Sequence, residues 1–129
     1  MGRIIILLLM HALGDFFLQS NRLSKIKAFR ISSMLEHVGI YTGVFIVLSP
    51  IILGLTIVQG LYFSILNGFL HLVVDYFISK GKLKYTDTSE SKYILLIFID
   101  HILHISILIV SYVYLFPAAY NTFEPFLKY

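Results

Sequence analysis

Long apolar stretches separated by short polar segments dominate the sequence. Each of them approaches or exceeds the roughly 20 residues that an α-helix needs to cross about 30 Å of hydrocarbon. In hydrocarbon a backbone has to satisfy its own polar groups, which at this size favours helices. The pattern predicts an all-α fold, a four-helix transmembrane bundle that forms a single domain over residues 1–129. The expected helices cover about residues 4–20, 31–53, 55–79 and 93–116.

The composition separates this chain from soluble proteins. Hydrophobic residues make up 58% of the chain and charged residues 13%, whereas soluble domains have about 45–50% and about 25%. The sequence has no cysteine, which excludes disulfides and thiolate metal ligands. The net charge of +3 does not indicate a nucleic-acid partner, because most basic residues lie in two connecting segments.

These two segments predict the topology of the bundle. They read "NRLSKIKAFR" and "KGKLKYTDTSESK", whereas the segment "SPIILGLT" between the second and third stretches has no charge. Lys and Arg are concentrated in cytoplasmic loops. We therefore expect both basic segments in the cytoplasm and both the N-terminus and the C-terminus outside.

Ionisable residues interrupt the apolar stretches with a regular spacing. Residues four apart share a helix face, and a carboxylate at the centre of a spanning helix costs roughly 2.5–3.5 kcal/mol. At about 1.5 Å of rise per residue, all these groups fall in the cytoplasmic half of the bundle. We therefore predict one polar site that is built from three pairs and one further histidine: His11/Asp15, His71/Asp75, Asp100/His104 and His37.

The residue types in this site fit one or two divalent metal ions. His and Asp without Cys are ligands for zinc, manganese or iron. The predicted metal ligands are His11, Asp15, His71, Asp75, Asp100 and His104. His37 and Asp75 are predicted to be catalytic, His37 as a further ligand or a general acid and base. Five more residues are predicted to contact the substrate or to orient the ligands: Gln19, Asn67, His101, Arg22 and Lys80.

Small residues predict where the helices approach each other. Gly39-x-x-x-Gly43 and Gly60-x-x-x-Ser64-x-x-x-Gly68 are stripes of the kind that lets two backbones pack closely.

The site fits three functions. The leading prediction is a metal-dependent hydrolase that acts on a membrane lipid or another amphiphile from the cytoplasmic side. A proton- or ion-coupled transport component would use the same residue types without a metal. A non-enzymatic membrane interaction partner, docking through the basic loops, is the third alternative. The pattern is compatible with a homo-oligomer.

Four segments carry a resemblance to a known family over nearly the whole chain. "HALGDFFLQ", "EHVGIYTGVF", "NGFLHLVVDYFISKGK" and "FIDHILHISILI" resemble the small bacterial membrane proteins of domain of unknown function 3307. The family pattern has Gln where this chain has His101, which leaves the Asp100/His104 pair intact. The resemblance implies a multi-pass protein of the bacterial cytoplasmic (inner) membrane and no established activity. A more distant similarity to membrane-bound metal-dependent hydrolases implies a hydrolase by analogy alone.

Overall fold

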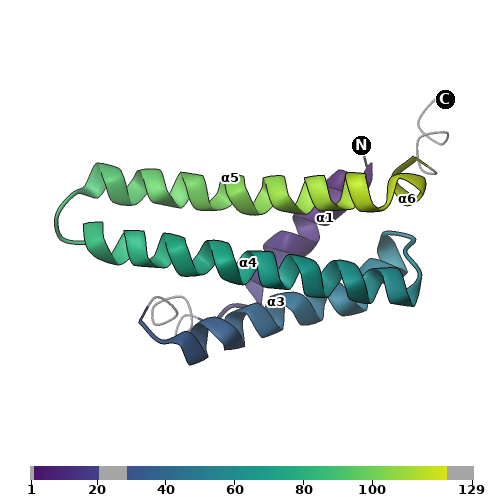
Figure 1. Cartoon of the computed structure of the whole chain (residues 1–129), viewed down its shortest axis with the longest axis horizontal. Helices are drawn as coiled ribbons and strands as arrows, with labels where there is room; N and C mark the ends of the chain where they lie inside the picture. Colours follow the sequence, from purple (N-terminus) through teal and green to yellow (C-terminus); the bar gives the residue numbers. More distant parts are fainter. Residues whose placement is uncertain (1, 21–28, 122–129) are drawn as a thin grey trace.

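The computed structural model describes residues 2–20 and 29–121 (Figure 1). The described part is helical and contains no strand, which confirms the prediction of an all-α fold. Its elements in chain order are α1 (Gly2–Ala12), the π-helical turn η1 (Leu13–Phe17), α3 (Ile31–Ile52), α4 (Ile57–Tyr85), α5 (Glu90–Leu115) and α6 (Pro117–Asn121).

The three long helices run along the long axis of the molecule, with α4 between α3 and α5 (Figure 1). Helix α1 crosses them obliquely and contacts both α3 and α5. The start of α3 and the turn between α4 and α5 lie at one end, and the start of α1 and helix α6 lie at the other (Figure 1). We call the first of these the basic end, since it carries Lys80, Lys82, Lys84 and Lys92.

Three helices rather than four are long and apolar enough to cross a membrane, namely α3, α4 and α5. The predicted spanning helix over residues 4–20 is wrong, because α1 has 11 residues and ends at Ala12. At about 1.5 Å per residue such a helix covers roughly 16 Å, about half of the hydrocarbon thickness. The apolar run continues beyond Ala12, but its backbone turns into η1 instead of a longer α-helix.

The three long helices begin and end close to the expected residues, except at the end of α4, where the difference affects the functional site. Helix α4 continues to Tyr85, well beyond its predicted end at residue 79, so the Lys-rich segment expected as a loop is largely helical. Lysine is a good helix former, and cations are favourable in the last turn of a helix. Lys82 is therefore held on a rigid element that also carries Asp75.

The long helices bury several polar side chains and expose many large apolar ones, unlike the helices of a soluble protein. His37, Ser49 and Ser64 are fully buried, whereas the exposed fractions of Ile51 and Val58 are 74% and 77%. Contiguous exposed apolar side chains mark surfaces that contact lipid or a partner. Together with the three apolar spans, this pattern indicates a multi-pass membrane protein.

Arg3 joins the start of α1 to three other elements at the end opposite the basic end. Its guanidinium Nη1 donates to the backbone carbonyl of Leu53, at 2.5 Å, and to that of Ala119. The same nitrogen lies 3.1 Å from the hydroxyl of Tyr112 on α5. Gly54, with φ of 68°, leaves room for this group, because a Cβ there would lie 2.9 Å from Arg3 Nη2.

Glycines on α4 let that helix approach α3 closely. A Cβ on Gly60 would lie 2.7 Å from Cγ of Pro50 and 2.8 Å from Oγ of Ser49. Gly68 faces Thr42 in the same way, with its virtual Cβ 3.2 Å from that of Thr42. The predicted stripe on α4 is therefore a packing surface. The stripe of Gly39 and Gly43 is not, because no described atom lies within 4 Å of a Cβ built at either position.

Gly60→Ala is expected to lower the free energy of unfolding by about 1–3 kcal/mol, because the new methyl group would meet the rigid Pro50 ring. Unfolding in mixed micelles with increasing denaturing detergent measures this change. Gly43→Ala is the matched control and should be close to neutral, since its methyl group meets no described atom. Equal losses in the two variants would contradict the close approach of α3 and α4.

Candidate functional site

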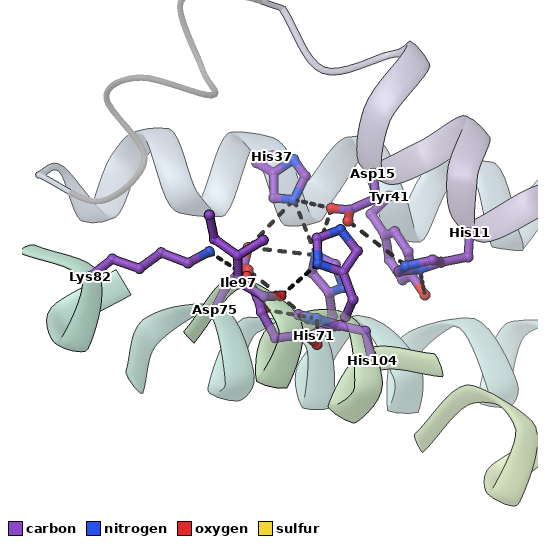
Figure 2. Close-up of polar contacts among 11 residues, drawn as sticks. His11, Asp15, His37, Tyr41, His71, Asp75, Lys82, Ile97 and His104 are labelled. Carbon is purple, nitrogen blue, oxygen red and sulfur yellow. Dashed lines mark hydrogen bonds and ion pairs between the residues drawn. The ribbon is translucent and has the colours of Figure 1, made fainter. Parts of the chain in front are cut away.

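Polar side chains from four elements converge inside the bundle (Figure 2). The centre is formed by two carboxylates and three imidazoles, which we call the His–Asp cluster: Asp15 of η1, His37 of α3, His71 and Asp75 of α4, and His104 of α5. All three imidazoles are at least 94% buried. His37 is about 9 Å along α3 from its start, so the cluster lies in the half of the bundle toward the basic end.

Two imidazole nitrogens meet at the middle of the cluster. Nε2 of His37 lies 3.1 Å from Nε2 of His71. Oδ1 of Asp15 lies 3.1 Å from the His37 nitrogen and 3.5 Å from the His71 nitrogen. Oδ2 of Asp75 lies 3.4 Å and 3.5 Å from the same two atoms. Two imidazole nitrogens this close are stable only when one donates a proton to the other or when both donate lone pairs to a cation.

His104 faces the cluster from α5 and is oriented by Asp100. Nδ1 of His104 lies 3.1 Å from Oδ1 of Asp100 and 2.9 Å from its backbone carbonyl oxygen. This leaves Nε2 of His104 toward the cluster, 4.0 Å from Oδ1 of Asp75. Asp100 itself accepts a hydrogen bond from Lys82 Nζ at 2.5 Å. Asp100 therefore neutralises a lysine and positions a histidine, in the manner of the outer partner of a metal-binding imidazole.

His11 and Tyr41 close the cluster on the side away from the basic end. Nδ1 of His11 lies 3.4 Å from the Tyr41 hydroxyl, and its Nε2 lies 3.8 Å from Oδ2 of Asp15. The Tyr41 ring stacks on the His71 ring with centroids 4.1 Å apart. Figure 2 shows His11 beyond Asp15, so it lies at the edge of the cluster rather than at its centre.

The local backbone of η1 brings Asp15 to the cluster. A π-helical turn inserts a residue into the helix and occurs frequently at functional sites. Gly14, the second residue of this turn, is buried against α3, and a Cβ there would lie 3.3 Å from Cα of Tyr41. The absence of a side chain at Gly14 thus lets η1 approach α3, and Asp15 reaches His37.

The geometry of the cluster fits a metal ion. Two groups of potential ligands have their ligand atoms within 4.8 Å of one another, namely Asp15/His37/His71 and His71/Asp75/His104. Ligands at about 2.0–2.2 Å from a tetrahedral ion are about 3.3–3.6 Å apart. The three separations in the first group are 3.1, 3.1 and 3.5 Å, so small shifts of the side chains would give the spacing that such an ion requires.

Two predicted substrate contacts lie elsewhere. Nδ2 of Asn67 donates to the Phe63 carbonyl at 2.9 Å, and its Oδ1 accepts from Ser111 at 3.0 Å, so its polar atoms serve the packing of α4 on α5. Nδ1 of His101 lies 2.7 Å from the Ile97 carbonyl oxygen, and its ring stacks on Phe16. Neither residue belongs to the cluster.

The three remaining candidates differ in position. Nε2 of Gln19 is buried and has no hydrogen-bond partner among the described residues. Lys80 is exposed and donates to the Tyr76 hydroxyl at 2.5 Å, outside the cluster. Arg22 lies outside the described residues.

The comparison with protein families agrees with the resemblance seen in the sequence. The model described as "Protein of unknown function (DUF3307)" matches residues 4–128. The chain belongs to the DUF3307 family. No curated protein and no solved structure matches it, and no relative supports the expected metal binding or hydrolase activity. The function of this DUF3307 protein is therefore argued from its own cluster.

The sequence analysis missed two features of the site in this DUF3307 chain. One is the contact of Lys82 with Asp100. The sequence signal for it is that Lys82 follows Asp75 by seven residues, an interval that places both residues on the same face of a continuous helix. The other is the π-helical turn that positions Asp15, for which the apolar pattern carries no signal.

Proposed function

We propose that this protein is a multi-pass protein of the bacterial cytoplasmic membrane that binds a divalent metal ion in the His–Asp cluster and hydrolyses a lipid or another amphiphile. The main support is the spacing of 3.1–3.5 Å among the ligand atoms of Asp15, His37 and His71. Zinc, manganese and iron are the ions that this ligand set favours.

The charge of the cluster supports the same proposal. Asp15 and Asp75 bring two negative charges, and neutral imidazoles do not offset them. Buried charges are stable when they are paired or coordinate a metal, so a divalent cation would stabilise the arrangement. Nε2 of His71 contacts both carboxylates. Because one imidazole nitrogen binds one ion, we propose a single ion held by Asp15, His37 and His71.

The remaining groups would then carry the proton transfers. A bound ion of this kind activates water and polarises the bond to be cleaved. Asp75 lies 3.4 Å from His37 Nε2 and is proposed as the general base, so that His37 acts as a ligand. His104 lies 4.0 Å from Asp75 and is proposed to share its proton, held in position by Asp100.

The basic end is proposed to face the cytoplasm, because it carries Lys80, Lys82, Lys84 and Lys92. The cluster is about 9 Å from the start of α3 at this end. A substrate in the cytoplasmic leaflet would reach it with its polar group, whereas a soluble substrate would face the apolar side chains that cover the outside of the bundle.

Asp75→Asn is expected to lower the hydrolysis rate by about 10²–10⁴-fold, the usual effect of removing a general base. The assay follows release of product from phospholipids and carboxyl-ester lipids in vesicles, after treatment with a chelator and again after return of zinc or manganese. Asp87→Asn, at an exposed position on the turn between α4 and α5, is the matched control and should keep the wild-type rate. Hydrolysis that persists after chelation or in Asp75→Asn would refute this mechanism.

A second candidate, a proton-coupled transport component, is favoured by the continuity of the polar contacts. Ion-pair contacts of 4.0 Å or less lead inward from the basic end, in the order Lys82, Asp100, His104, Asp75, His71, Asp15 and His11. Chains of Asp and His form proton relays in membrane proteins. Proton flux into liposomes that Asp75→Asn abolishes, in protein free of metal, would favour this candidate over the hydrolase.

A further inference from the structure

A pocket lies at the basic end, between the start of α3 and the last turns of α4. It has a volume of about 320 Å³, and its lining includes Arg30, Met34, Tyr76, Ser79 and Lys80. Met34 is three residues before His37 and Ser79 is four residues after Asp75. The pocket is therefore one helical turn from the His–Asp cluster but shares no residue with it.

Two cations without a carboxylate partner line this pocket. The ion pairs among the described residues include neither Arg30 nor Lys80. Lys80 is nevertheless held in place, because its Nζ donates to the Tyr76 hydroxyl at 2.5 Å and lies 4.2 Å from the centroid of that ring. Two cations that no described carboxylate neutralises favour an anionic ligand.

The start of α3 adds hydrogen-bond donors on the same side. Arg30 is the N-cap residue, and its side chain makes no capping hydrogen bond. The first bonds to the Arg30 carbonyl come from Ser33 and Met34, so the backbone N–H groups of Ile31 and Ser32 precede the hydrogen-bonded part of the helix. Such N–H groups and the helix dipole favour phosphate and other anions. A 22-residue helix thus points its positive end to a pocket that already contains two cations.

The apolar walls of the pocket indicate whether the anion is a free ion or the headgroup of a lipid. Phe29 and Ile31 contribute apolar side chains that are 73% and 59% exposed, and Met34 lies beneath them. A free inorganic anion gains nothing from such walls, whereas a lipid brings acyl chains beside its headgroup. We propose that this pocket binds the phosphate group of an anionic lipid from the leaflet at the basic end. The proposal does not depend on metal binding or on hydrolysis.

Titration with lipid, followed by native mass spectrometry of the full chain in detergent, tests this proposal. The wild-type protein should bind phosphatidylglycerol more tightly than phosphatidylcholine. Arg30→Gln/Lys80→Gln should weaken phosphatidylglycerol binding by about 30-fold, which corresponds to about 1 kcal/mol per cation near the headgroups. The Tyr76→Phe variant keeps the ring but frees Lys80, and it should weaken the same binding by a smaller factor.

Lys84→Gln/Lys92→Gln is the matched control. It removes the same charge from the same end, at lysines that stack on Tyr85 outside the pocket. Binding of phosphatidylglycerol should remain close to that of the wild type. An equal loss in both double variants would mean diffuse attraction by the basic end and would overturn the proposal. Displacement of the lipid by inorganic phosphate at an equal concentration would overturn the proposal that the bound phosphate group belongs to a lipid.

Discussion

His71→Ala is expected to remove the divalent ion from the purified protein. Its Nε2 lies within 3.5 Å of His37, Asp15 and Asp75 together. Loss of an outer-sphere partner alone lowers metal affinity by about 10–100-fold, so loss of this ligand should lower it further. Elemental mass spectrometry of protein purified in detergent without chelators measures the metal content. We expect about one equivalent in the wild-type protein and none in the variant.

His101→Ala is the matched control for this experiment, because it removes a partly buried histidine of α5 that lies outside the cluster. It should retain the wild-type metal content. Wild-type protein that contains no metal and does not take up zinc, manganese or iron would contradict the proposed metal site. The close contact of His37 with His71 would then be a shared proton, and the proton-coupled alternative would be the one to pursue.

Arg3→Met is expected to lower the free energy of unfolding by about 2–4 kcal/mol. Its guanidinium donates to the carbonyls of Leu53 and Ala119, and a hydrogen bond to a charged group contributes about 1.5–3 kcal/mol. The Leu53 carbonyl keeps the longer bond from the Tyr112 hydroxyl at 3.3 Å. Methionine retains most of the apolar part of the arginine side chain, so the decrease in the free energy of unfolding reports mainly on the hydrogen bonds. Unfolding in mixed micelles measures the change.

Arg30→Met makes the same substitution at the other end of the bundle, where the side chain is exposed and has no ion pair among the described residues. In detergent without anionic lipid this control should change the free energy of unfolding by no more than about 0.5 kcal/mol. If Arg3→Met were equally mild, the anchoring of α1 to the ends of α3 and α6 would be refuted.

The sequence predicted the position of the cluster because its signal is a spacing on regular helices. The His71/Asp75 pair and His37 lie on long α-helices, where a four-residue interval defines a common face. The structure brings them together as expected, with Asp15 and His104 beside them.

The sequence could not predict which carboxylates face the centre. Asp100 is predicted to be a ligand, and the structure places its carboxylate against Lys82, which the continuation of α4 brings within reach. Asn67 was expected to contact a substrate, but its amide is used between α4 and α5. Both outcomes depend on which side chain of a neighbouring helix lies opposite, which the periodicity of a single helix does not specify.

The fourth span failed as a prediction because hydropathy does not report backbone geometry. Residues 4–20 have the composition of a spanning helix, whereas the α-helix in them ends at Ala12 and a π-helical turn follows. Polar residues in an apolar run are compatible with both structures, since in each case the bundle can bury them.

The early end of α1 determines how the surrounding bilayer must adapt. Arg3 lies at the end opposite the basic end, whereas η1 ends at Phe17 near the depth of the cluster. The last carbonyls of a helix have no intrahelical partner, and hydrocarbon chains cannot hydrogen-bond to them. We therefore expect headgroups and water to descend to this depth beside η1, which would thin the membrane locally on that side. Such a hydrated depression would supply the cluster with water without any channel between the three long helices.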